Sequence, residues 1–188
     1  METGIISSRP ASERGRLGLW LFFISEVFLF GALLAMRFHL WGATRPDLDQ
    51  RLGLAVTSVL LASSFFMNRA EAAIAHNDRT NFIGSLLITG TLGVAFLVGV
   101  VGFEWRGNIR PSDGVYGSVL FAMTGLHALH VLSGVALIGV ILFKALRGEF
   151  STRSHWGVEA GAIYWHFVDL VWVFYYPALY LMGSPSGP

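Results

Sequence analysis

The sequence contains no cysteine, and only 13% of its 188 residues are charged, about half the share of roughly 25% that is usual for a soluble domain. The lack of cysteine excludes a disulfide framework, cysteine-ligated iron–sulfur or zinc sites, and a covalently attached c-type haem. It also excludes a thiolate copper centre, so a redox metal on this chain would need its six histidines. The low charge, the 54% of hydrophobic residues and the mean hydropathy of +0.59 argue against a soluble globule and against disorder. The net charge of +1 gives no sign of a nucleic-acid partner.

Long apolar stretches predict an all-helical membrane protein. A transmembrane helix needs about 20 mainly apolar residues, and stretches that meet or approach this length lie at about 17–41, 52–75, 82–103, 115–143 and 160–182. The connections between them are short and polar, and they leave no space for an extramembrane domain. Barrel strands would alternate apolar and polar residues, and these stretches do not. We therefore expect a bundle of five transmembrane helices.

The placement of Lys and Arg predicts the orientation of this bundle. With five spans, the N-terminus and the connections after the second and fourth helices share one side, which holds more basic residues than the other. The richer side holds Arg9, Arg14, Arg16, Arg69, Arg79, Lys144, Arg147 and Arg153, and the other side holds Arg37, Arg45, Arg51, Arg106 and Arg110. We therefore expect a polar cytoplasmic segment at 1–16, a five-helix membrane domain at 17–183 that begins with an uncleaved helix, and a short tail at 184–188, with the C-terminus outside.

Glu26 lies near the middle of the first expected helix, where an ionisable group is costly and needs an explanation. One interpretation is functional: a proton carrier, or a contact to lipid or to another subunit. The other is a protonated carboxyl group that forms a hydrogen bond inside the bundle. The residues alone leave both open.

Histidines and acids recur on the last two helices. His127 and His130 are three residues apart and so share a helix face, as do His166 and Asp169; Glu159 lies two turns before His166. Histidines on neighbouring helices could bind haem or a metal, but hydrogen-bonded histidines within a bundle are the simpler interpretation. Four basic side chains lie at the expected cytoplasmic surface. They could bind lipid phosphates, or they could serve only to orient the helices in the membrane. These are Arg69, Arg79, Arg153 and His155.

Several motifs occur in a specific order along the chain. They are ISEV at 24–27, TLG at 91–93, SDGVYGS at 112–118, TGLHALHV at 124–131, EAG at 159–161 and YWHFVDLVW at 164–172. Together they resemble subunit III of the haem–copper oxidases, which include the cytochrome c and quinol oxidases, over about 17–183. The long form of that family has seven transmembrane helices, and this chain resembles the last five. The resemblance therefore implies a short form without the opening helix pair, as in several prokaryotic members.

The resemblance implies a subunit that carries no haem or copper of its own. In the family, electron transfer, oxygen reduction and proton pumping belong to subunits I and II, where haem and copper are expected. Subunit III contacts subunit I directly, binds phospholipid, and supports proton uptake and the durability of the catalytic core. Because the long form encloses lipid between its two helical groups, a neighbouring subunit would have to supply the missing wall here. The expected location is the cytoplasmic membrane of a prokaryote.

The same resemblance assigns roles to single residues. Glu26 matches the intramembrane carboxylate of the family, linked to protons or lipid. The characteristic polar positions of the family, with structural or interface roles rather than catalytic ones, correspond to His127, His130, Glu159, His166 and Asp169, of which the last three are also candidates for links to protons or lipid. Structural or interface roles are likewise expected for Asp113 and Tyr116.

Three other functions stay open at this point. A homologue associated with nitric oxide reductase has a similar length and helix count. A small b-type haem cytochrome would use His127, His130 and His166, and would show a Soret band as a lone chain. A transporter or proton channel would use Glu26 and Asp169, but the sequence shows neither an internal repeat nor a continuous polar stripe.

Overall fold

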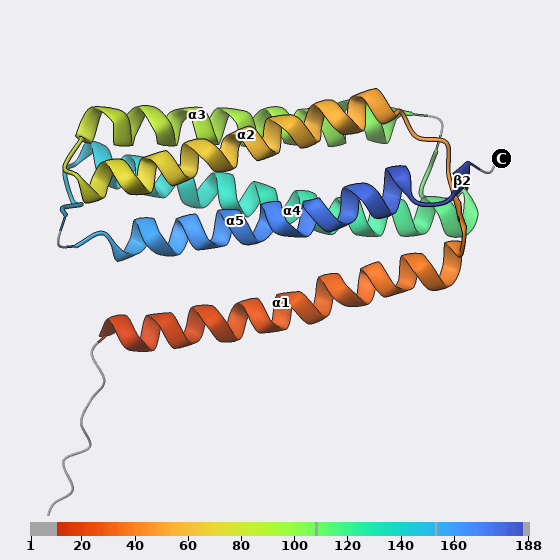
Figure 1. The fold of residues 1–188 in the computed structure, drawn as a ribbon, viewed down its shortest axis with the longest axis horizontal. Helices are drawn as coiled ribbons and strands as arrows, with labels where there is room; N and C mark the ends of the chain where they lie inside the picture. Colours follow the sequence, from red (N-terminus) through yellow and green to blue (C-terminus); the bar gives the residue numbers. More distant parts are fainter. Residues whose placement is uncertain (1–10, 108, 153, 186–188) are drawn as a thin grey trace, which may run out of the picture.

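The computed structural model describes residues 11–107, 109–152 and 154–185 of the chain, and it confirms the all-helical class (Figure 1). The described residues form five α-helices. They are α1 (Ala11–Trp41), α2 (Gln50–Ala75), α3 (Arg79–Leu97), α4 (Gly114–Leu146) and α5 (Trp156–Tyr176). Helix α1 begins six residues earlier than expected, within the segment that the sequence analysis assigns to a polar N-terminal region. The prediction for residues 1–10 concerns positions outside the described residues.

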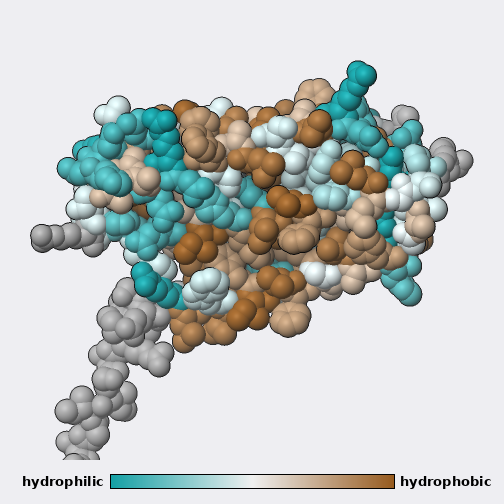
Figure 2. All heavy atoms as spheres, in the orientation of Figure 1, coloured by the Kyte–Doolittle hydropathy of each residue, from teal (hydrophilic) through white to brown (hydrophobic). Residues whose placement is uncertain are grey.

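Within the described residues, four helical segments have the length and composition to cross a membrane: Gly15–Trp41, Gln50–Ala75, Arg79–Arg106 and Gly114–Leu146. Helix α5 does not reach this level, because its sequence combines Trp, Tyr and His with Glu159 and Asp169. It runs along the bundle beside α4 and buries large side chains such as Trp165 and Trp172. On the face shown in Figure 2, apolar residues predominate across the middle of the molecule and hydrophilic residues gather toward both ends, as expected for a protein that spans a bilayer.

Tryptophan side chains fix α5 against α2. The indole N–H of Trp165 donates to Ser63 Oγ at 3.0 Å, and that of Trp172 donates to Thr57 Oγ1 at 2.9 Å. Space for the Trp165 ring comes from Gly93 on α3, where an added Cβ would lie 2.6 Å from the ring. In a bilayer, helices associate through such close packing and interhelical hydrogen bonds, so these contacts hold α2, α3 and α5 together.

Helices α2 and α3 form a hairpin whose connection lies outside the spans. Asp78 caps α3 by accepting a hydrogen bond from the backbone N–H of Asn81 at 3.1 Å, as N-cap acids commonly do. The side-chain amide of Asn81 donates to the same carboxylate at 2.5 Å. This amide, followed by the backbone N–H groups, holds the pKa of Asp78 below its ordinary value of 3.8.

Helix α1 lies at one edge of the bundle (Figure 1). Its inner face contacts α5 through aromatic pairs: Phe23 with Phe167 at 4.9 Å between ring centroids, and Phe30 with Tyr175 at 5.8 Å. Its outer face stays uncovered, and Phe28 is 74% exposed. An apolar face of this kind is suited to lipid or to another membrane subunit.

The end of the bundle opposite the start of α1 contains irregular backbone that the sequence pattern does not predict. Helix α3 continues as a π-helical segment, η1 (Val98–Phe103), and a 3-10 turn, η2 (Glu104–Arg106), and α5 continues as a π-helical segment, η3 (Pro177–Leu181). The short strands β1 (Thr44–Arg45) and β2 (Ser184–Pro185) pair in parallel. They meet because Gly183 has a φ of 102°, and an added Cβ there would lie 2.8 Å from the Ala43 carbonyl oxygen.

Candidate functional site

The carboxyl group of Glu26 on α1 lies against the imidazole of His130 on α4, halfway along the bundle. Glu26 Oε2 and His130 Nε2 are 3.0 Å apart, and both side chains are largely buried, at 14% and 16% exposure. His130 Nδ1 lies 2.9 Å from the Leu126 carbonyl oxygen. The Phe30 ring covers the imidazole edge-on at 4.8 Å.

The hydrogen bonds of His130 limit its protonation to two arrangements. A carbonyl oxygen only accepts, so Nδ1 must carry a proton and donate it to Leu126. In a neutral ring Nε2 is then an acceptor, and Glu26 must be the protonated donor. In a charged ring Nε2 donates to a Glu26 carboxylate. Either arrangement places one proton between Nε2 and Oε2 and leaves the pair without net charge, which meets the requirement for a polar pair at membrane depth.

Two hydroxyl groups extend this pair to α5. Ser133 Oγ donates to the His130 carbonyl oxygen at 2.8 Å, and the Tyr164 hydroxyl lies 2.5 Å from Ser133 Oγ and 3.3 Å from the same carbonyl oxygen. Tyr164 belongs to α5, and its ring stacks on Phe22 of α1 at 6.1 Å. The polar cluster Glu26–His130–Ser133–Tyr164 therefore joins α1, α4 and α5.

A second polar cluster joins α2 and α5. His166 Nδ1 lies 2.7 Å from Ser64 Oγ, a partner that the sequence analysis did not identify. Asp169 is buried one turn further along α5, and its carboxyl group interacts with the same Ser64 side chain. His166 Nε2 makes no hydrogen bond among the described residues. Because both His166 and Asp169 interact with Ser64 of α2, they lie on the same face of α5, as the sequence spacing predicts.

His127 is enclosed by aromatic rings. Its side chain is 0% exposed, its ring stacks on Trp172 at 4.8 Å, and the edge of Phe96 lies at 5.6 Å. Neither ring nitrogen has a hydrogen-bond partner within the described ranges. The residue therefore contributes packing between α3, α4 and α5.

The three intramembrane histidines thus contact different helices. His130 faces α1, His127 faces α3 and α5, and His166 faces α2. Within the part of the chain that the structure describes, no group of three or more His, Asp or Glu side chains could hold a metal ion.

Glu159 lies in the first turn of α5, at the end of the bundle that holds the N-terminus of α1. Its carboxylate is 3.6 Å from Arg16 Nη2 and 3.3 Å from His155 Nε2. The Arg16 guanidinium also covers the Trp156 ring at 4.9 Å. Glu159 therefore joins α1 to α5 at the surface.

The candidates for lipid headgroup binding already have protein contacts. Arg69 donates to Asn81 Oδ1 at 3.0 Å, and Arg79 donates to the carbonyl oxygens of Ala145 and Leu146 at the end of α4, at 3.1 and 2.8 Å. His155 contacts Glu159, as above. Arg153 lies outside the described residues.

Asp113 and Tyr116 organise the start of α4. Asp113 Oδ2 accepts from the backbone N–H of Arg110 at 2.6 Å, and the Tyr116 hydroxyl meets Thr44 Oγ1 at 2.5 Å. Both contacts are local to the end of the bundle where β1 and β2 pair. They support a structural role for these two residues.

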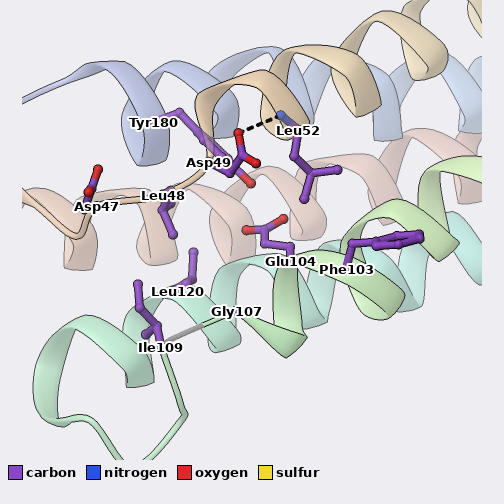
Figure 3. A pocket seen from close by; sticks show the side chains of 10 residues that line it. All are labelled: Asp47, Leu48, Asp49, Leu52, Phe103, Glu104, Gly107, Ile109, Leu120 and Tyr180. Carbon is purple, nitrogen blue, oxygen red and sulfur yellow. Dashed lines mark hydrogen bonds between the residues drawn. The ribbon is translucent and has the colours of Figure 1, made fainter.

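The same end of the bundle holds features that the sequence analysis did not single out. Arg37, which interrupts the first apolar stretch, is buried and donates to backbone carbonyl oxygens. Glu104, which the sequence analysis placed in a connection, lines a cavity together with Tyr180 (Figure 3). In both cases the sequence shows a charged residue within or beside an apolar stretch, which indicates a special role. The residues that contact it lie far away in the sequence, so its partners could not be predicted.

Taken together, fold and site define a helical membrane protein whose polar groups mainly connect one helix to another. The chain matches the description "Cytochrome c oxidase subunit III" over residues 8–184. It is 38% identical over 189 residues to "Cytochrome c oxidase subunit 3" of Bos taurus, covering 93% of this chain and 72% of that protein. The protein of the same name from Equus caballus is 37% identical over 182 residues, covering 90% and 70%. The chain belongs to the cytochrome c oxidase subunit III family.

Membership of this family confirms the resemblance seen in the motifs. It assigns the chain to the accessory subunits of a terminal oxidase, an oxidoreductase complex of respiration and proton translocation that contains further subunits. The matched residues extend from before the first span to η3 and β2.

Proposed function

We propose that this chain is a non-redox accessory subunit that contacts subunit I of a proton-pumping terminal oxidase, with subunit II and further subunits in the same complex. It binds phospholipid and supports proton uptake and the stability of the catalytic core. Haem and copper reside in the partner subunits, which take electrons from cytochrome c or quinol and pass them to oxygen. The chain itself supplies no catalytic residue.

The Glu26–His130 contact is the observation that carries this proposal. An ionisable pair at membrane depth is used here to fix the outlying helix α1 to α4, rather than to bind a metal or to line a continuous polar path. Such a pair holds α1 in position while its outer face remains apolar and uncovered. A surface of this kind supports docking on a larger membrane subunit and on lipid.

The proposal includes five spans, with the N-terminus in the cytoplasm and the C-terminus outside. Helix α5 supports a fifth span because it runs the length of the bundle beside α4 (Figure 1), and its Asp169 is buried inside the bundle. Two of the basic residues at the expected outer end, Arg37 and Arg45, are buried. The outer surface therefore exposes even fewer basic side chains, relative to the cytoplasmic surface, than the sequence count indicates. The membrane proposed is the cytoplasmic membrane of a prokaryote, which cell fractionation tests.

Purification of the native complex in mild detergent tests the proposal, with identification of each accompanying chain by mass spectrometry. We expect subunits I and II of a haem–copper oxidase in fixed proportion to this chain. If the accompanying chain is instead the catalytic subunit of a nitric oxide reductase, this chain is an accessory subunit of that enzyme and not of an oxidase. Isolation of the chain without any haem–copper partner, from membranes that contain assembled oxidase, would contradict the proposal.

A further inference from the structure

An apolar groove of about 510 Å³ runs between α4 and the last part of α3 with η1. It exists because Gly102, Gly125 and Ala128 fill little of the space between the two helical segments. Aliphatic side chains form the rest of its walls, and none of the described lining residues is charged. Trp105 of η2 belongs to the lining at the end of the bundle that holds β1 and β2.

The size of this groove matches one hydrocarbon chain. Its lining on α4 extends from Gly125 to Leu132, about 10 Å at 1.5 Å per residue. This is about two-thirds of one leaflet, since the hydrocarbon core of a bilayer is about 30 Å thick. A volume of about 510 Å³ over this length gives a cross-section of about 50 Å², which is smaller than that of an α-helix about 10–12 Å across. The groove therefore accepts an acyl chain but not a helix of another subunit.

A second hollow, of about 580 Å³, adjoins Trp105 and is basic. Its lining includes Arg106 and Arg110. Both arginines are exposed, and among the described residues neither guanidinium group has an ion pair or a hydrogen bond. Glu104, two residues before Arg106, is directed into the other cavity, with Tyr180 (Figure 3). The hollow thus carries positive charge that the described part of the chain leaves without a counter-ion.

Contacts with α4 hold the groove and the hollow in a fixed relation. The Trp105 indole N–H donates to Thr124 Oγ1 at 3.1 Å, so the ring stays at the boundary between them. The Arg110 backbone forms a turn, because its N–H donates to Asp113 Oδ2 at 2.6 Å and its carbonyl oxygen accepts from the Asp113 N–H at 3.0 Å. Gly117 of α4 lies directly against this carbonyl oxygen. Only the arginine side chains would have to move to meet a ligand.

An anionic phospholipid combines the chemistry that both spaces require. Arginine pairs with phosphate oxygens through charge-assisted, often bidentate hydrogen bonds, and tryptophan is enriched at the level where headgroups meet the hydrocarbon. Phosphatidylcholine and phosphatidylethanolamine carry a positive charge beside their phosphate, so two arginines without a counter-ion favour a lipid of net negative charge. Inorganic phosphate would fit the basic hollow but would leave the apolar groove unfilled.

We infer that the groove and the hollow together hold one anionic phospholipid, with an acyl chain along Gly125 and Ala128 and the phosphate between Arg106 and Arg110. This site lies between α3 and α4, away from the uncovered outer face of α1. The inference rests on the proposed function, because it gives the proposed phospholipid binding a place and a charge class.

An electron cryomicroscopy structure of the intact complex tests the inference directly. We expect a phospholipid with one chain in the groove and a phosphate oxygen about 2.7–3.2 Å from a guanidinium nitrogen of Arg106 or Arg110. A carboxylate of another subunit between these arginines, a side chain of another subunit in the groove, or a groove without a lipid would overturn the inference and leave the proposed function intact. Absence of any oxidase partner from the native preparation would instead overturn the proposed function.

Charge variants give a second test by native mass spectrometry. The purified complex is titrated with phosphatidylglycerol or with phosphatidylcholine of the same chains, and the lipids that stay on this chain after its release are counted. The double variant Arg106→Gln, Arg110→Gln should bind phosphatidylglycerol at least about tenfold more weakly and phosphatidylcholine less than about twofold more weakly, since each basic side chain near a membrane surface adds to the attraction for anionic lipid. The matched control is Arg51→Gln, which removes an exposed charge at the same end and should bind both lipids as the wild type does.

A glycine variant tests the groove separately from the charge. Gly125→Leu places a side chain in the groove and should weaken binding of both lipids, whereas Gly139→Leu on the same helix, which has open space, should not. If Gly125→Leu prevents assembly, the arginine variants carry the test, because both of these side chains are exposed.

Two results would overturn the inference. One is equal affinity for phosphatidylglycerol in the double arginine variant and in Arg51→Gln. The other is displacement of the lipid from this chain by inorganic phosphate, which would show a site for small anions only.

Discussion

Arg37 offers the most direct test of how the bundle is held together. Its side chain is 1% exposed, and it donates to three well-placed carbonyl oxygens. Nε reaches Ala178 at 2.6 Å, Nη1 reaches Gly42 at 3.1 Å and Nη2 reaches Met182 at 2.5 Å. The guanidinium also lies over the Trp41 ring at 5.0 Å. One side chain therefore joins the end of α1 to η3 and the residue that follows it.

Arg37→Met keeps most of the apolar stem and removes all of these donors. Hydrogen bonds to a charged group contribute about 1.5–3 kcal/mol each, and part of this sum is offset because the buried guanidinium no longer has to be desolvated. We therefore expect a loss of about 3–5 kcal/mol in the free energy of unfolding. For a chain of this size that loss lowers the unfolding temperature by roughly 10 °C.

Tryptophan fluorescence during heating in mild detergent measures this effect. Arg51→Met is the matched control, because Arg51 is exposed at the same end of the bundle and its side chain has no hydrogen bond or ion pair within the described structure. Arg37→Lys should fall between the wild type and Arg37→Met, since a single ammonium cannot reproduce the planar set of donors. Equal unfolding temperatures for Arg37→Met and Arg51→Met would refute the stabilising role.

Three further predictions concern other parts of the chain. Glu26→Gln should leave initial oxidase turnover nearly intact and chiefly shorten the lifetime or lower the yield of the complex, and complete loss of turnover in an assembled variant would contradict this. Gly93→Val should lower the unfolding temperature by several degrees, because overpacking costs about 1–3 kcal/mol where the new side chain meets Trp165, whereas Gly84→Val, which has open space, should not. Asp78→Ala should destabilise the chain at neutral pH. Because the pKa of Asp78 is lowered from 3.8, its contribution is full above that value and is lost as the pH falls through the folded-state pKa. The difference between this variant and the wild type should therefore close in strong acid, and a difference independent of pH would contradict the role of the charge.

The helices could be predicted from the sequence because hydropathy and length report directly on burial in a bilayer. The limits of α2, for example, are close to those expected, and Asp49 begins it as an N-cap with hydrogen bonds to the backbone N–H groups of Arg51 and Leu52. Helix α5 is less clear by hydropathy, because Trp, Tyr and His lower its mean hydropathy, although Trp165, Trp172 and Tyr175 are buried inside the bundle.

The contacts between helices could not be predicted in the same way. That His130 meets Glu26 while His127, one turn earlier, meets Trp172 depends on how α4 is rotated against α1 and α5. Both histidines fit the same periodic pattern, and the sequence alone does not separate their surroundings. The cavity beside Glu104 depends on two π-helical segments, for which no sequence signal was identified.

Metal and haem analysis of this chain after its separation from the purified complex tests the central claim most directly. The account predicts haem and copper in the intact complex, and neither a Soret band nor stoichiometric iron or copper in the separated, folded chain. Iron or copper bound in a fixed ratio to the lone chain would contradict the account, because the subunit would then carry a redox centre of its own.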